Sequence, residues 1–171
     1  MKPKLLVAIG DGETSQRTAL YVARACAGSE SSFGGVVVFH VFVPDPPFVE
    51  GADPVAAEEL AERTARQRTA AAEQILADIK NTMILEGVKP ERITTELAAA
   101  EGDITKQIVR AAAAHDCDTI VVGRHNRSRL SEFLDGGVVD HIMRKPIGYT
   151  IWLVERSMRI QSAFEDLAGA L

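Results

Sequence analysis

The sequence predicts an α/β domain in which a five-stranded parallel sheet is covered by helices on both faces. Short apolar runs rich in β-branched residues alternate with longer segments of helical periodicity along the chain. Three of these runs are apolar at nearly every position, which is typical of central strands buried on both faces. Such strand–helix alternation gives a parallel sheet with right-handed crossover connections.

Five apolar runs are predicted as strands, and none reaches the roughly 18 residues needed to span a bilayer. Because the N-terminus leads directly into the first run, without a signal sequence, we expect a cytoplasmic protein with no membrane partner. The five runs cover residues 4–9, 35–43, 92–98, 119–122 and 149–155.

The first two predicted helices have recognisable ends. Thr14 or Ser15 is expected to cap a helix that runs to about Ala27, ahead of Gly28. Asp53 is expected to cap a second helix that starts at Pro54 and continues to Gly87. This helix would be about 50 Å long at 1.5 Å per residue, which exceeds the sheet it must cover. Its second half is therefore expected to pack on the sheet. Its first half, rich in Ala, Glu and Arg, is expected to project or bend.

Two further helices follow within the same domain. Asp103 is expected to cap a helix over 104–115. Another helix is expected to begin at Gly137 or Val138, after the fourth strand.

A terminal extension follows the last strand. Its apolar residues recur at i, i+3, i+4, i+7 and i+11, which predicts an amphipathic helix over 156–171. We therefore divide the chain into an α/β domain, residues 1–155, and a C-terminal helical extension, residues 156–171. The extension is expected to bury its apolar stripe either on its own domain or on a partner.

Composition and residue spacing exclude several classes of function. A net charge of -5 argues against binding to nucleic acid or to anionic membranes. The four histidines lack the spacing of a metal site, so none is expected. No catalytic motif of nucleotide hydrolases or serine hydrolases is present, and we expect a protein that is not an enzyme. Cys26 and Cys117 form no C-x-x-C pair and are expected to be buried small side chains.

Four segments together resemble the universal stress protein family, over residues 4–155. The third of them is the most specific, since a capped helix, a D-x-I-V-V-G strand and a basic loop follow in the family's order. The segments are LLVAIGDGETSQRTAL, VVVFHVFVP, EGDITKQIVRAAAAHDCDTIVVGRHNRSRLSEFLDGGVVDHIM and YTIWLVE.

This resemblance implies the strand order 3-2-1-4-5 and a role in the stress response. It also implies a homodimer in which the fifth strands of two subunits pair. Because that strand is apolar on both faces and would otherwise expose an edge, we expect a partner or the terminal extension to cover it. The candidate interface residues are Tyr149, Ile151, Trp152, Leu153 and Val154.

Some members of the family bind ATP through a loop of the pattern G-x2-G-x9-G-[ST]. Glycines let backbone N–H groups reach phosphate oxygens, and the final hydroxyl donates a further hydrogen bond. On this sequence the pattern falls on Gly123, Asn126, Gly136 and Gly137, so two of its four positions differ. Gly137 cannot supply the hydroxyl. Losing one or two hydrogen bonds to a charged ligand weakens binding by about ten-fold to ten-thousand-fold.

Charges around this loop act in opposite directions. Asp135 would stand beside the phosphates and repel them. Arg124, Arg127 and Arg129 could offset that repulsion, or they could pair with neighbouring acidic residues.

The turn after the first strand is the other part of the expected site. ATP-binding members of the family carry an aspartate directly after this strand, facing the base and ribose. Here Gly10 takes that place and Asp11 follows, so either a longer turn brings Asp11 to the ligand or the contact is lost. The turn lies at the carboxyl end of a parallel strand, where α/β folds bind ligands. The candidate nucleotide-binding residues are Ile9, Gly10, Asp11, Gly12, His40, Val41, Gly123, Arg124, Asn126, Arg127, Gly136, Gly137 and Val138.

We therefore expect a non-enzymatic, homodimeric universal stress protein that acts by binding and assembly, with an altered and weakened nucleotide site. The sequence establishes no cofactor, and ATP, another nucleotide or another small anion is the candidate ligand. Two alternatives remain open. In the first alternative, the site binds ATP or another nucleotide, with at most slow hydrolysis, through Asp11, Gly123, Asn126 and Gly136, assisted by the neighbouring arginines. Otherwise the chain is an interaction module whose long second helix and terminal helix recognise another protein.

Overall fold

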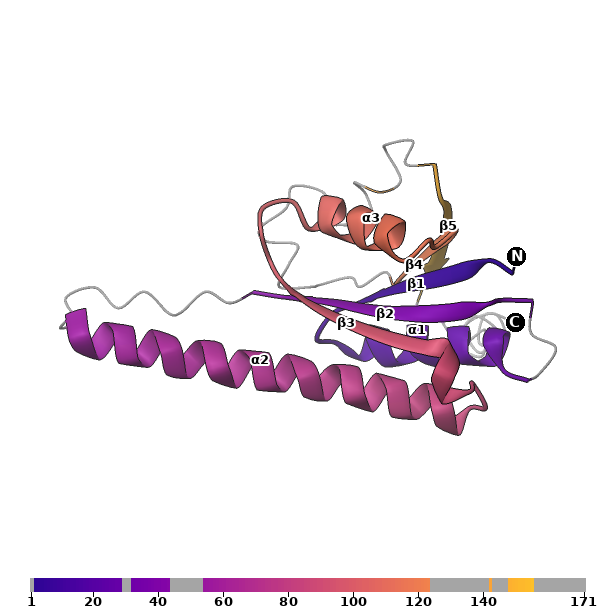
Figure 1. Cartoon of the computed structure of the whole chain (residues 1–171). Coiled ribbons are helices and arrows are strands. Elements are labelled where there is room, and N and C mark those ends of the chain that lie inside the picture. The colour runs from indigo at the N-terminus through magenta and orange to yellow at the C-terminus, as the bar shows by residue number, and fades with distance from the viewer. Residues whose placement is uncertain (1, 29–31, 44–53, 124–141, 143–147, 156–171) are drawn as a thin grey trace, which may run out of the picture.

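A single five-stranded parallel sheet forms the centre of the protein (Figure 1). The computed structural model describes residues 2–28, 32–43, 54–123, 142 and 148–155. The strand order is β3-β2-β1-β4-β5 and every neighbouring pair is parallel, so the predicted order 3-2-1-4-5 is confirmed. The strands are β1 (Lys4–Ile9), β2 (Gly35–Phe42), β3 (Ile93–Ala99), β4 (Thr119–Gly123) and β5 (Thr150–Val154).

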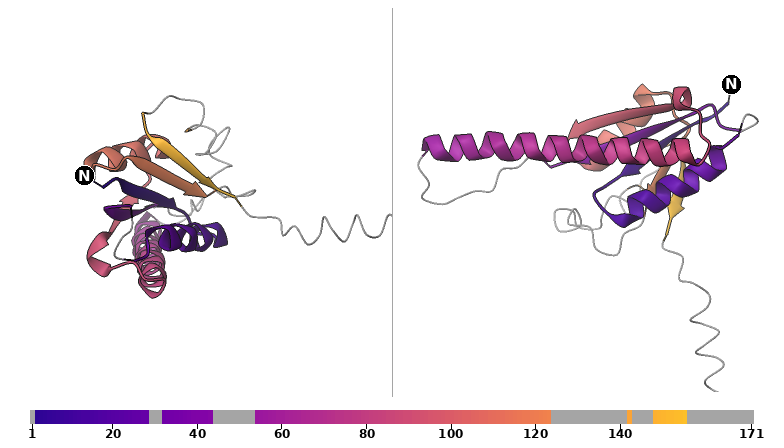
Figure 2. Two further views of the ribbon diagram at one scale, coloured as in Figure 1. Left: turned by 90° about the vertical axis from the view of Figure 1, so that its right-hand side faces the viewer. Right: turned by 90° about the horizontal axis from the view of Figure 1, so that it is seen from below.

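Helices cover both faces of this sheet (Figure 2). On one face lie α1 (Glu13–Cys26) and α2 (Pro54–Leu85), and on the other lies α3 (Ile104–Ala114). A short 3-10 helix, η1 (Pro90–Arg92), leads into β3.

Strand residues alternate between the two faces with the period of two that an extended chain imposes. In β1, Leu5 and Val7 pack towards α1 and α2, whereas Leu6 packs towards α3. All three side chains are fully buried, as the apolar run predicts for a central strand.

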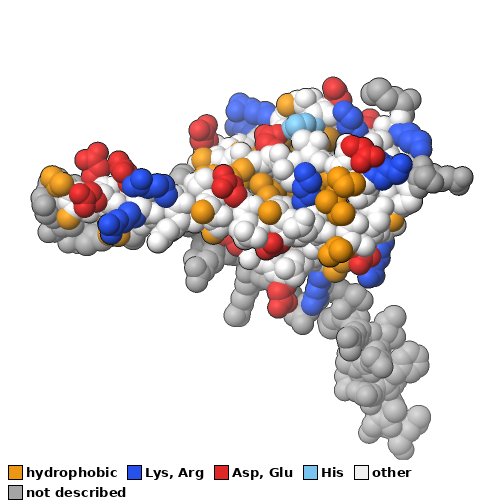
Figure 3. Space-filling view, turned by 60° about the horizontal axis from the view of Figure 1, so that its bottom comes forward, with side chains coloured by type: hydrophobic (Ala, Val, Ile, Leu, Met, Phe, Trp, Pro, Cys, Tyr) orange, Lys and Arg blue, Asp and Glu red, His pale blue; other side chains and the backbone are white. Residues whose placement is uncertain are grey.

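The long helix α2 is continuous over 32 residues, which corresponds to about 48 Å. Its C-terminal half packs on the sheet through Leu76, Ile79 and Met83. Its N-terminal half extends past the end of the sheet (Figures 1 and 2). Acidic and basic side chains cover this projecting part (Figure 3), and Arg66 pairs with Glu62 at 3.1 Å. The predicted projection is confirmed, and it occurs without a bend.

The start of α1 differs from the prediction, because neither Thr14 nor Ser15 is the cap. The helix begins at Glu13 after an N-cap at Gly12, and no side chain caps it. The Ser15 hydroxyl donates to the Gly10 carbonyl oxygen at 2.7 Å and accepts from the Gly10 N–H at 2.9 Å. Ser15 therefore fixes the turn after β1 and leaves the helix end uncapped.

The predicted cap of α3 is confirmed. The Asp103 carboxylate accepts hydrogen bonds from the backbone N–H groups of Thr105, at 2.9 Å, and Lys106, at 3.4 Å. The helix ends at Ala114, one residue before the predicted end. No helix in the described ranges is long and apolar enough to cross a membrane.

Two other predicted helices cannot be compared with the fold. The start at Gly137 or Val138 and the extension over 156–171 lie outside the described residues. Ile142, within the first of these two helices, is helical and buried.

Candidate functional site

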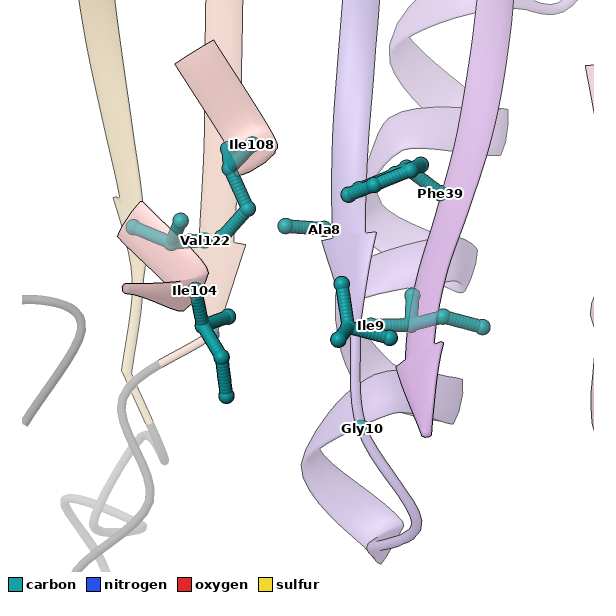
Figure 4. Close-up of a pocket in the computed structure, with 9 residues that line it drawn as sticks. Ala8, Ile9, Gly10, Phe39, Ile104, Ile108 and Val122 are labelled. Atoms are coloured by element: carbon teal, nitrogen blue, oxygen red, sulfur yellow. The ribbon is translucent and has the colours of Figure 1, made fainter. Parts of the chain in front are cut away.

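A pocket opens at the carboxyl ends of β1, β2 and β4, on the face that α3 covers. It contains about 490 Å³ of space, including its open mouth. Figure 4 shows Ile104, Ile108 and Val122 on one side of it, opposite Ala8 and Phe39. Parallel α/β sheets bind their ligands at this edge. The lining residues are Ala8, Ile9, Gly10, Phe39, Val41, Ile104, Ile108, Val122 and Gly123.

The described lining of this pocket is apolar. Among the lining residues that the structure describes, no side chain carries a charge or a hydrogen-bonding group, and the polar atoms belong to the backbone. The N–H and carbonyl oxygen of Gly10 are both already bonded to the Ser15 hydroxyl. This part of the pocket therefore offers a surface for a flat apolar ring and no charged partner for a phosphate.

Four of the predicted binding residues line this pocket, and three others do not. Asp11 and Gly12 line a second pocket on the α1 and α2 side of the turn, and His40 lines neither pocket. The four residues in the first pocket are Ile9, Gly10, Val41 and Gly123. The predicted residues Arg124, Asn126, Arg127, Gly136, Gly137 and Val138 lie outside the described part of the chain.

Residues of α3 belong to this site although the sequence did not mark them. Ile104 and Ile108, at positions i and i+4 of α3, face the pocket from the first turns of the helix. Their spacing indicates a buried helix face, but it does not show that a cavity lies beneath that face.

His40 connects the turn after β1 to β2. Its side chain is fully buried, and Nδ1 lies 3.0 Å from the Ile9 carbonyl oxygen. Because a carbonyl oxygen only accepts hydrogen bonds, Nδ1 carries a proton. On the other side of the ring, Nε2 lies 3.2 Å from a carboxylate oxygen of Asp11, whose side chain is 82% exposed. Nε2 and the carboxylate oxygen are close enough for an ion pair, but they are not aligned for a hydrogen bond.

The two groups favour each other's charged form. Burial lowers the pKa of His40, but the Asp11 carboxylate and the Ile9 carbonyl together outweigh burial and raise that pKa above its ordinary value of 6.5. Interaction with His40 likewise lowers the pKa of Asp11 below 3.8, against the opposing effect of burial. The attraction is mainly electrostatic, because Nε2 and the carboxylate are poorly aligned for a hydrogen bond.

Both cysteines are buried and free, as predicted. Burial raises the pKa of each thiol to about 11. Within the described ranges, no three His, Cys, Asp or Glu side chains gather where they could hold a metal ion.

The predicted interface residues, on β5 and at Tyr149 just before it, pack against their own chain. The Trp152 ring meets Phe33 edge to face at a centroid distance of 5.3 Å, and Tyr21 at 6.1 Å. All five candidate side chains stay half-buried. Val154 packs on the same face as Trp152, and Tyr149, Ile151 and Leu153 pack on the opposite face.

The fold and this pocket define an open, parallel α/β protein with an apolar-lined pocket at the carboxyl edge of its sheet. The sequence profile of the universal stress protein family (Usp) matches residues 1–146, and the chain belongs to that family. A search among curated proteins finds no significant match.

Solved structures share this fold. Hypothetical protein MJ0577 aligns with a TM-score of 0.66 and 22% identity, over 92% of this chain and 99% of that chain. A universal stress protein in complex with cAMP aligns with a TM-score of 0.59 and 16% identity, over 89% and 96% of the two chains. The universal stress protein from Archaeoglobus fulgidus in complex with dAMP aligns with a TM-score of 0.50 and 16% identity, over 90% of this chain and 98% of that chain. At these identities the likeness shows the fold.

Proposed function

We propose that this universal stress protein is a non-enzymatic binding protein whose pocket takes an adenine nucleotide weakly. The placement of Asp11 carries this proposal. Gly10 stands where ATP-binding members of the family carry an aspartate, and Asp11 contacts His40 on the other side of the turn. The described lining of the pocket therefore contributes no carboxylate to a ribose hydroxyl.

Two further observations support an adenine nucleotide as the ligand class. The apolar lining suits a flat base, and two similar structures contain cAMP and dAMP, each of which has a single phosphate. The missing hydroxyl at Gly137 supports weak binding of phosphate groups.

We further propose that the protein acts as a homodimer joined through β5. In the described chain, β5 pairs with β4 along one edge and has no strand on its other edge. An unpaired edge is a ready site for a strand of a second subunit, and a two-fold dimer would pair the two edges with each other.

An interaction module is a second candidate function, favoured by the shape of α2. The projecting half of this helix exposes Val55 and Leu60, at 64% and 44%. A pull-down with the wild type and with the Val55→Ser/Leu60→Ser variant would test this interaction role. A partner protein that binds the projecting half of α2 should be retained by the wild type and not by the variant.

Calorimetric titration with cAMP, AMP and ATP tests the leading proposal. We expect dissociation constants weaker than about 10 µM and no phosphate release from ATP. Restoring the missing groups by Gly10→Asp and Gly137→Ser should tighten binding by about ten-fold or more. A Cβ at Gly10 would meet nothing within 4 Å, so the first variant should fold normally.

Gly10→Asn is the matched control, because it has the shape of the aspartate without its charge. Tightening by aspartate and by asparagine alike would point to a shape effect and not to the missing carboxylate. Purified protein that carries ATP, or that binds it below about 1 µM, would overturn the weakened site. Turnover of ATP would overturn the non-enzymatic assignment.

A further inference from the structure

The turn after β1 separates the two pockets. Gly10 lines both of them, the nucleotide pocket on the α3 side and the second pocket on the α1 and α2 side. Asp11 lines only the second one. The side on which its carboxylate lies therefore decides how much negative charge the nucleotide pocket faces.

Building on the proposed function, we propose that His40 is a positioning residue. In its doubly protonated form it holds Asp11 on the α1 and α2 side of the turn and cancels its charge, which keeps the nucleotide pocket open to anions.

Hydrogen bonds hold the backbone around this pair, whereas the Asp11 side chain is mostly exposed. The Ile9 carbonyl is bonded to His40, and both backbone groups of Gly10 are bonded to Ser15. Asp11, in contrast, is 82% exposed, and its carboxylate lies 3.2 Å from His40 Nε2. A change in the charge of His40 therefore acts first on the Asp11 carboxylate.

The other charged residues that line the described part of the second pocket are acidic. Glu13 of α1 and Asp78 of α2 line the second pocket with Asp11, and Arg17 lies 4.0 Å from Glu13. In the sheet, His40 is flanked by Ile9 of β1 and Leu97 of β3, both uncharged. Within the described residues, the proton on His40 is thus the positive charge that lies against the Asp11 carboxylate.

Loss of that proton changes the net charge of the pair from zero to -1. Nδ1 keeps its proton because it faces the Ile9 carbonyl, so Nε2 becomes the bare acceptor. Two acceptors then face each other at 3.2 Å, and the exposed carboxylate moves away. An anion in the neighbouring pocket is disfavoured, while a neutral ligand of the same shape is not.

Binding of cAMP and of adenosine from pH 5.5 to 8.5 tests this inference. The cyclic phosphodiester keeps a single negative charge over the whole range, so the ligand itself does not titrate. We expect the dissociation constant for cAMP to rise by about three-fold through the titration of His40, as one unscreened charge about 7 Å away would produce in water. The constant for adenosine should change less than about two-fold.

Two variants distinguish the roles of the two nitrogen atoms of the His40 ring. In His40→Gln the amide nitrogen can take the place of Nε2, which keeps a donor for Asp11 without a titrating group. In His40→Asn it can take the place of Nδ1, which keeps only the bond to Ile9. Both variants should bind cAMP independently of pH, and His40→Gln should bind it more tightly. Thermal melts establish that both are folded.

The histidine signals in NMR spectra give a readout without ligand. The His40 titration should share its midpoint with the change in cAMP affinity, and Asp11→Asn should lower that midpoint. A pH-independent affinity for cAMP alongside a titrating His40 overturns the inference and leaves the proposed function standing. A pH dependence that persists in His40→Gln also overturns it. Absence of binding by both ligands at every pH overturns the inference and the proposed function together.

Discussion

The methyl group of Thr14 occupies the space that a side chain at Gly123 would need. A Cβ built on Gly123 would lie 2.5 Å from Thr14 Cγ2 and 2.7 Å from Thr18 Oγ1. The Thr18 hydroxyl is held in place by a 2.8 Å hydrogen bond to the Thr14 carbonyl oxygen. The close packing of α1 on the end of β4 therefore requires glycine here, whether or not a phosphate binds.

Gly123→Ala should lower the free energy of unfolding by about 1–3 kcal/mol, because the added methyl group overpacks this contact. Urea denaturation measures the change. Gly10→Ala is the matched control, since a Cβ there meets nothing within 4 Å, and it should range from no effect to a gain of about 1 kcal/mol. Adding Thr14→Ser to Gly123→Ala removes the nearest atom and should recover part of the loss. If Gly123→Ala were as stable as the wild type, packing against α1 would not require glycine at this position. The phosphate-binding loop would then be the remaining reason for the glycine.

The pair of His40 and Asp11 should make stability depend on pH in two windows. The pKa of His40 is raised in the folded state, so its contribution is complete below about 6.5 and is lost as pH rises through the folded value. The pKa of Asp11 is lowered, so its contribution is complete above about 3.8 and is lost as pH falls through the folded value.

Denaturation of the wild type and of Asp11→Asn at pH 5.5 and pH 8.5 measures this dependence. The wild type should lose stability between the two pH values, and the variant should lose less. Equal losses in both proteins would assign the pH dependence to other groups.

Asp103→Ala should lower the free energy of unfolding by about 1 kcal/mol, because the N-terminal N–H groups of α3 lose their acceptor. The helix carries Ile104 and Ile108 over the pocket, so fraying should also weaken nucleotide binding. Asp103→Ser retains a capping oxygen and should restore most of both properties. Denaturation and cAMP titration of the two variants check this, and equal effects of alanine and serine would contradict the capping role.

The sheet could be predicted from sequence because its signals are local. The central strands are apolar on nearly every residue, and the bounds of β1 agree with the predicted run. The cap at Asp103 was equally readable, since an N-cap depends on residues within one turn.

The side chains around the site could not be placed in this way. Whether Ser15 caps α1 or bonds to Gly10 depends on the path of the turn. The side on which Asp11 lies depends on His40, which comes beside it only because Ile9 and His40 are in register across β1 and β2. Contacts of this kind arise from tertiary structure, and the spacing of residues in the sequence does not contain them.

The outer edge of β5, which pairs with no strand in the described part of the chain, provides a test of the proposed dimer that spares the fold. The Thr150 N–H donates to the Asp118 carbonyl oxygen at 3.1 Å, on the side of β4. Because successive N–H groups of a strand point to alternate sides, those of Ile151 and Leu153 point to the free edge. A proline at one of these two positions removes an N–H that β4 does not use, and edge strands tolerate it.

Leu153→Pro should therefore convert the dimer to a monomer while the protein stays folded. Sedimentation equilibrium gives the mass, and circular dichroism reports the fold. Leu153→Ala controls for the loss of the side chain, which packs on the α3 face, and it should remain dimeric because its backbone can still pair. A wild type that is monomeric at high concentration removes the proposed dimer. A Leu153→Pro variant with unchanged mass places the subunit contact on a surface other than the edge of β5.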